Sequence, residues 1–120
     1  AQAWRAARLV VDTGVHAMGW TRTQAIDDMV GRAGLPRPDA EAEVDRYYVR
    51  PGQALGYKLG ELQILKLRKA AHDALGERFD LRAFNQEVID HGALPLPVLE
   101  RVITAWIARV RSAPPGADAR

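Results

Sequence analysis

The sequence contains no cysteine, and this absence excludes both a disulfide framework and a thiolate metal site. No apolar run approaches the roughly 20 residues that a membrane-spanning helix needs. No cluster of five or six basic residues occurs and the net charge is only +2, so nucleic-acid binding gains no support. A hydrophobic content of 48% and a charged content of 27% are ordinary for a globular chain, and 120 residues allow at most one domain.

What the sequence does contain is helical periodicity, with no stretch that alternates like a β-strand. Apolar spacing and helix-end signals predict six helices at about residues 2–18, 22–32, 39–49, 52–76, 81–91 and 98–111. The segment 112–120 is rich in Pro, Gly, Ala and Asp and is predicted to be a disordered tail. The expected fold class is therefore all-α, an irregular helical bundle over residues 1–111.

Several helix ends carry specific signals. Thr21 and Gln24 have the spacing of a capping box, in which the two side chains satisfy each other's backbone N–H groups. Asp80 is placed as the N-cap of the fifth helix, and Phe79 before it is expected to pack against Phe84.

The stretch 47–60 is the most unusual part of the chain, because it gathers three tyrosines with an arginine, a lysine and a glutamine. Pro51 disfavours a helical conformation at the residue before it and presets φ for a helix that begins directly after it. On such a helix, Gln53 and Tyr57 lie one turn apart on the same face. The first turns are apolar nearly all round, which indicates a helix buried inside a larger body.

Glycines interrupt two of the predicted helices. Gly56 and Gly60 lie on either side of Tyr57, and Gly14 follows Thr13 in the first helix. Each glycine costs about 1 kcal/mol relative to alanine inside a helix. We therefore expect another backbone or a ligand to approach Gly56 and Gly60, and a close neighbour at Gly14.

Arg8, Asp12 and His16 follow one another at four-residue spacing on the first helix, so each can contact the next. One interpretation is a partly buried cluster at the edge of a site, in which Asp12 orients the imidazole of His16. The other is a salt-bridged helix face without a chemical role, and the residues by themselves favour it.

No complete catalytic site can be assembled from the motifs of this chain. Its histidines, His16, His72 and His91, are never paired four residues apart, and the zinc motif H-E-x-x-H is absent. There is no P-loop, no G-x-S-x-G and no glycine-rich dinucleotide turn. We therefore predict no metal ligands and no cofactor within these residues.

Three groups of residues together resemble the C-terminal part of the bacterial domain-of-unknown-function family 885. These groups are residues 8–16 with 19–21, residues 43–47 and residues 51–60, and residues 78–81 and 92–96 fit as well. Members of that family are similar to helical zinc metallopeptidases of the gluzincin type. Their H-E-x-x-H helix and third zinc-ligating glutamate lie upstream of the part present here. The resemblance therefore implies zinc for the parent protein but no zinc ligand in this chain.

The resemblance also implies roles for individual side chains. Helical zinc peptidases place a tyrosine, and often a histidine, over the scissile carbonyl, where a donor stabilises the tetrahedral oxyanion. Tyr57 is the first candidate for that tyrosine, and His16 is the candidate histidine. Tyr47 and Tyr48 are second choices for it and are predicted to contact substrate, and one of the three tyrosines is expected to belong to the core.

Two further side chains are predicted to bind substrate. Arg50 is suited to a carboxylate through two parallel hydrogen bonds, and it is equally suited to cap a helix C-terminus. Gln53 is placed on the predicted Tyr57 face. Lys58 points away from Tyr57 and is expected to be solvated or salt-bridged.

The chain starts at Ala1 and its first residues read as the middle of a helix, so we expect a piece of a longer protein. Under the resemblance it forms one wall of a substrate cleft, with the upstream catalytic half of the parent and a peptide-like substrate as partners. The compartment is left open, with export or cell-envelope association of the parent as one option. The alternative function is a non-catalytic helical interaction module that uses the apolar faces of the long and last helices.

Overall fold

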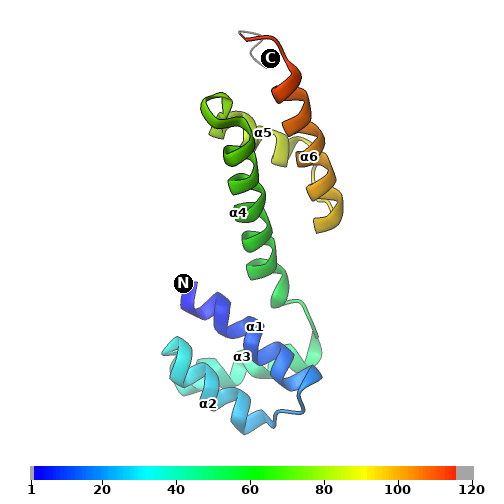
Figure 1. The fold of residues 1–120 in the computed structure, drawn as a ribbon. Helices are drawn as coiled ribbons and strands as arrows, with labels where there is room; N and C mark the ends of the chain where they lie inside the picture. Colours follow the sequence, from blue (N-terminus) through cyan, green and yellow to red (C-terminus); the bar gives the residue numbers. More distant parts are fainter. Residues whose placement is uncertain (1, 116–120) are drawn as a thin grey trace. The chain divides into compact units, whose positions relative to one another are not determined.

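The structure is a computed structural model that describes residues 2–115, and helices are the only regular elements over that range (Figure 1). In chain order the elements are α1 (Gln2–Ala17), α2 (Arg22–Ala33), α3 (Arg37–Val49), α4 (Leu55–Leu75), the 3-10 turn η1 (Gly76–Arg78), α5 (Leu81–Asp90) and α6 (Leu96–Ser112). The predicted all-α fold class with six helices is confirmed.

The predicted tail starts one residue too early, because Ser112 is the last residue of α6. The guanidinium of Arg78 holds this end of the chain by donating to three carbonyl oxygens, those of Val110, Arg111 and Ala113, at 3.2, 3.1 and 2.9 Å. Such bonds satisfy carbonyl groups that a helix end leaves without a partner. Residues 116–120, which make up most of the predicted tail, lie outside the described residues.

The chain divides into two compact units, with the boundary after Glu61. Unit 1 contains α1, α2, α3 and the first turns of α4. Unit 2 contains the rest of α4 with α5 and α6. Helix α4 crosses the boundary without a break.

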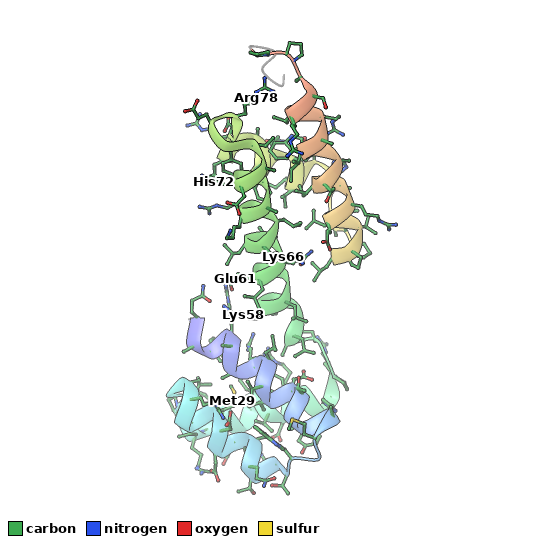
Figure 2. The ribbon with its side chains drawn as sticks, in the orientation of Figure 1. Met29, Lys58, Glu61, Lys66, His72 and Arg78 are labelled. Atoms are coloured by element: carbon green, nitrogen blue, oxygen red, sulfur yellow. The ribbon has the colours of Figure 1, made fainter. Side chains whose placement is uncertain are left out.

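Unit 1 has its own apolar core, to which α1, α2 and α3 contribute. Its largest fully buried side chains are Tyr47, Ile26, Met29, Val11 and Val44. Met29 of α2 is labelled in Figure 2. Along each helix these positions recur every three or four residues, which is the spacing that turns one helix face inward.

Unit 2 has a separate core, in which Leu67, Ala71 and Leu75 of α4 meet Phe84 of α5 and Leu99, Ile103 and Trp106 of α6. Phe84 is fully buried, and its ring centroid lies 6.1 Å from that of Phe79 and 6.1 Å from that of Trp106. These separations are typical of packed aromatic pairs. The predicted contact between Phe79 and Phe84 is therefore confirmed.

The helix ends that carried local signals lie where the sequence predicts them. Gln24 N–H donates to Thr21 Oγ1 at 3.2 Å, and Thr21 N–H donates to Gln24 Oε1 at 2.9 Å, which completes the capping box. Asp80 accepts a hydrogen bond from Arg82 N–H at 2.7 Å as the N-cap of α5. These caps depend only on residues two or three positions apart.

The start of α4 differs from the prediction. α4 begins at Leu55, and the four residues from Pro51 onward form a turn. Gly52 has a φ of +78°, a left-handed conformation that interrupts any right-handed helix, and its N–H donates to the Asp12 carboxylate of α1 at 3.1 Å. Gln53 therefore lies in the turn and not on the helical face predicted for it.

The glycine predictions have different outcomes. A Cβ atom at Gly14 would lie 2.4 Å from the Trp20 ring, so the close neighbour predicted there is confirmed. At Gly56 and Gly60 nothing in the described chain lies within 4 Å of the position that a Cβ would take. The close approach of another backbone to these two glycines is therefore wrong for the described residues.

The first turns of α4 are exposed in this chain, although their composition is that of a buried helix. The partly exposed large apolar side chains on this part of α4 are Tyr57 (54%), Leu59 (42%), Leu62 (49%), Ile64 (37%) and Leu65 (48%).

Among the described helices, α4 included, none combines the length and the apolar character needed to cross a membrane.

Candidate functional site

The polar network of unit 1 centres on Glu43, a carboxylate in α3. Its Oε2 atom accepts hydrogen bonds from Arg8 Nη2 (2.8 Å), Arg8 Nε (3.2 Å), Arg46 Nη2 (2.7 Å) and Tyr47 Oη (2.9 Å). The Arg8 and Glu43 side chains are only 11% and 16% exposed, so salt screens this pair less than a surface pair. We refer to Arg8, Glu43, Arg46 and Tyr47 as the Glu43 network.

Tyr47 is the core tyrosine of the three, because only 1% of its surface is exposed. Burial raises the pKa of its phenol, and the hydrogen bond to Glu43 raises that pKa further. The phenol therefore keeps its proton and donates a hydrogen bond to Glu43. In this arrangement the Tyr47 phenol is engaged inside the network.

His16 is held by the end of α3 and not by Asp12. Its Nε2 lies 2.9 Å from the carbonyl oxygen of Tyr47. A helical carbonyl normally accepts from the N–H four residues later, and for Tyr47 that residue is Pro51, which has none. Since a carbonyl only accepts, Nε2 must carry the proton, which leaves Nδ1 of this exposed side chain free to face solvent or a ligand.

The predicted Arg8–Asp12–His16 cluster does not form. Arg8 pairs with Glu43, and His16 bonds to a backbone carbonyl. Asp12 is 2% exposed, and both of its carboxylate oxygens lie 3.1 Å from Gly52 N–H. Asp12 therefore fixes the turn between α3 and α4, which is the turn that leads into Tyr57.

Tyr57 and Tyr48 are the two accessible tyrosines of unit 1. Tyr57 is 54% exposed, and no hydrogen bond of its phenol occurs within residues 2–115. The Arg8 guanidinium lies over its ring, 5.9 Å from the centroid. Tyr48 is 44% exposed, and its ring meets that of His16 edge to face at a centroid separation of 6.1 Å.

The remaining predicted residues lie on the surface around this turn. Arg50 is exposed and is the C-cap residue of α3, where its backbone N–H donates to Arg46 O. Gln53 is exposed in the turn. Lys58 Nζ lies 3.0 Å from Gln2 Oε1 and 3.4 Å from Glu61 Oε2, so the salt-bridged interpretation of Lys58 is confirmed (Figure 2).

The structure thus gathers the predicted residues into two neighbouring sets. His16 lies with Tyr47 and Tyr48, and Tyr57 lies against Arg8. The Glu43 network joins the sets, because Arg8 and Tyr47 both donate to the same carboxylate oxygen. Within residues 2–115, no group of three or more His, Cys, Asp or Glu side chains is arranged to hold a metal ion.

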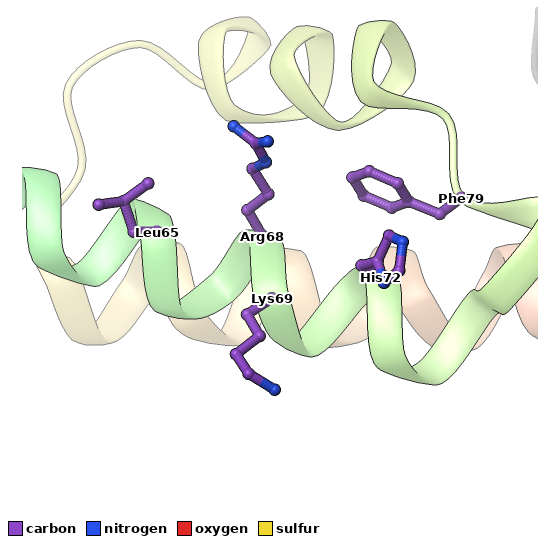
Figure 3. A pocket seen from close by; sticks show the side chains of 5 residues that line it. All are labelled: Leu65, Arg68, Lys69, His72 and Phe79. Carbon is purple, nitrogen blue, oxygen red and sulfur yellow. The ribbon is translucent and has the colours of Figure 1, made fainter.

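A separate shallow hollow of about 330 Å³ lies in unit 2 (Figure 3). Its lining residues are Leu65, Arg68, Lys69, His72 and Phe79. Lys69 pairs with Asp73, and the His72 ring packs edge to face on Phe79 at 5.4 Å. None of the side chains predicted to act on a substrate lines this hollow.

Sequence reasoning missed two residues of the site, Trp4 and Glu43. Trp4 lies one helical turn before Arg8, and the Arg8 guanidinium is 4.3 Å from the Trp4 ring centroid. The spacing of four between Trp4 and Arg8 was visible in the sequence and is a known signal for such contacts. Glu43 has a local signal in Arg46, which lies three residues later, but its partner Arg8 lies 35 residues away.

Comparison with known proteins places the chain among bacterial sequences. The family model described as "Bacterial protein of unknown function (DUF885)" matches residues 1–103. The crystal structure of a "putative lipoprotein" from Colwellia psychrerythraea is similar, with a TM-score of 0.86 and 50% sequence identity, over 88% of this chain. The match covers 18% of the Colwellia chain, so the present chain spans less than a fifth of that length. No curated protein matches.

Proposed function

Because the chain belongs to the DUF885 family of bacterial proteins, we propose that it forms one wall of the substrate cleft in a zinc-dependent peptidase-like hydrolase. In this proposal, Tyr57 and His16 stabilise the oxyanion, and Tyr48, Arg50 and Gln53 contact the substrate. The described residues offer no metal-binding group, so the zinc would be held by another part of a longer polypeptide.

The observation that carries the proposal is the environment of the Tyr57 side chain. Its ring lies against the Arg8 guanidinium, while its phenol has no partner within the described chain and is half exposed. A phenol in this condition can donate to an oxygen that becomes negative only as the tetrahedral intermediate forms. A donor that is already in place accelerates the reaction because it does not reorganise during the step.

His16 supplies a second group of the right kind. Its Nε2–H is engaged by the Tyr47 carbonyl at 2.9 Å, so the group that can meet a substrate is Nδ1. Nδ1 donates a proton only in the imidazolium form.

The exposed apolar side chains of α4 support a partner for this chain. Leu59, Leu62 and Leu65 are each more than 40% exposed, in a helix whose first turns are apolar nearly all round. We propose that the upstream catalytic half of the parent covers them. The Colwellia chain carries more than four-fifths of its length outside the matched region, which is consistent with such a partner in the same polypeptide.

The proposal for the compartment of the parent protein rests on the same relative. The Colwellia protein is described as a "putative lipoprotein", which favours a parent that is exported and attached to the cell envelope. A peptide-like substrate is the expected ligand class, because the proposed donors act on a carbonyl and the exposed Arg50 is suited to a carboxylate.

A non-catalytic interaction module is the second candidate, and the exposed apolar side chains of α4 favour it equally. In that case Tyr57 would be a packing residue. The two candidates differ in whether the longer polypeptide turns over a substrate.

The test is hydrolysis of a mixed set of short peptides by a polypeptide that contains this chain together with the sequence upstream of it. We expect turnover that a chelator abolishes and that added zinc restores. Absence of hydrolysis in the zinc-loaded protein would leave the interaction module as the better account. The chain alone, expressed as residues 1–120, is the negative control.

A further inference from the structure

The Arg8 side chain lies over two aromatic rings of unit 1. Its guanidinium carbon is 4.3 Å from the Trp4 ring centroid and 5.9 Å from the Tyr57 ring centroid. Trp4 and Arg8 share one face of α1, whereas Tyr57 comes from the first turn of α4. The guanidinium is therefore a group through which α1 contacts the proposed oxyanion donor.

Arg8 is itself held firmly. Two of its nitrogens, Nη2 and Nε, donate to the same oxygen of Glu43 at 2.8 and 3.2 Å, and the Arg8 side chain is 11% exposed. A planar guanidinium with two donors engaged has little freedom to rotate. Arg46 and Tyr47 donate to the same oxygen and hold Glu43 in turn.

Tyr57 is 54% exposed and lies between two glycines of α4. Gly56 precedes it and Gly60 follows one turn later, and neither has a neighbour within 4 Å of the place for a Cβ. No hydrogen bond fixes its phenol within the described chain. Within the described residues, the specific contact of this ring is the cation–π contact with Arg8.

We propose that Arg8 is the positioning residue for Tyr57, with Glu43 and Trp4 fixing the plane of its guanidinium. The contact uses the face of the Tyr57 ring and leaves the phenol oxygen free to donate. The catalytic consequence of this inference rests on the proposed function, while the structural consequence can be tested without it.

The structural test is an NMR spectrum of residues 1–120 with labelled tyrosine, in which Tyr57→Phe assigns the Tyr57 ring signals. In Arg8→Ala we expect these signals to move toward the values of free tyrosine, because the charge over the ring is gone. Arg46→Ala is the matched control, since it removes another donor from the same Glu43 oxygen and should leave the Tyr57 signals in place. Unchanged Tyr57 signals in a folded Arg8→Ala variant overturn the proposal.

Arg8→Ala removes two hydrogen bonds to Glu43, whose side chain is only 16% exposed, so the variant can lose its fold. The double variant Arg8→Gln, Glu43→Gln removes both charges and keeps a hydrogen-bonding pair of similar size. It should show the same displacement of the Tyr57 signals. Trp20 signals report whether unit 1 is folded, and a folded double variant with wild-type Tyr57 signals also overturns the proposal.

The catalytic test uses the longer polypeptide. We expect Arg8→Ala to lower kcat on the order of tenfold to a hundredfold with little change in KM, since a misplaced group loses rate more than binding. In a Tyr57→Phe background the same change should have no further effect on kcat. Independent effects of the two substitutions overturn the positioning role.

The proposed function of Tyr57 and the positioning role of Arg8 are contradicted by different results. If Tyr57→Phe itself leaves kcat unchanged, the proposed function of Tyr57 is wrong, but displaced NMR signals in Arg8→Ala still support the positioning contact. If Tyr57→Phe lowers kcat and Arg8→Ala lowers it independently, the proposed function stands and the positioning role does not.

Discussion

Tyr57→Phe in the longer polypeptide should lower kcat by a factor on the order of 10² to 10³ and leave KM nearly unchanged. Removing one oxyanion donor costs roughly 2.7–4 kcal/mol in the transition state. The substitution deletes only the phenol oxygen, and that oxygen has no partner within the described residues. The ring keeps its contact with Arg8, so the fold and the binding of the ground-state substrate should be preserved.

Tyr48→Phe is the matched control for this prediction. Tyr48 is also an exposed tyrosine of unit 1, at 44%, but its ring packs against His16 and its proposed role is contact with substrate. We expect its effect to be small and confined to KM. A wild-type kcat in Tyr57→Phe, measured by steady-state hydrolysis, would assign the oxyanion role to another group.

Phe84→Ala should destabilise unit 2 by about 3–5 kcal/mol, the usual cost of removing a fully buried phenylalanine side chain. Phe84 is fully buried between Phe79 and Trp106, and the other core members of the unit come from α4 and α6. A unit of this size has a total stability of comparable magnitude. We therefore expect the Trp106 indole signal to lose its folded position at 25 °C.

The NMR spectrum that shows the Trp106 indole signal also tests whether the two units have separate cores. Trp4 and Trp20 belong to unit 1, and their indole signals should keep their folded positions in Phe84→Ala. Leu81→Ala on the same helix is the control, because Leu81 is 42% exposed and should cost far less. Loss of all three indole signals in Phe84→Ala would show that the units fold together.

The helices were predictable because their signals are local. The capping box at Thr21, the N-cap at Asp80 and the apolar spacing of Leu99, Ile103 and Trp106 depend on residues within a few turns of one another. The start of α4 was not predictable in this way. Pro51 pointed to a helix start, and only the contact from Asp12, 40 residues away, shows why the turn continues to Ala54.

The residues of the candidate site could be predicted from the sequence, but the contacts that their side chains make could not. The four-residue spacing on one helix predicted that Asp12 contacts both Arg8 and His16. In the structure each of the three has its partner on another part of the chain. Packing between α1 and α3 decided the outcome. The position of Pro51 in the sequence shows which carbonyl lacks a helical donor, but not that His16 supplies it.

The choice among the three tyrosines also needed the fold. Tyr47 and Tyr48 are adjacent on α3 and therefore point in different directions, and the amphipathic pattern of that helix is too weak to say which is inside. The structure buries Tyr47 against Glu43 and leaves Tyr48 and Tyr57 accessible. The expectation that one of the three tyrosines belongs to the core is confirmed.

The most direct measurement of the central claim is a crystal structure of the longer polypeptide with a phosphinic peptide, whose tetrahedral phosphorus carries the oxygen that stands in for the oxyanion. The proposal predicts the Tyr57 phenol oxygen at hydrogen-bonding distance from that phosphinyl oxygen, roughly 2.7–3.1 Å. A Tyr57 side chain packed into an interface, with the inhibitor bound elsewhere, would contradict it.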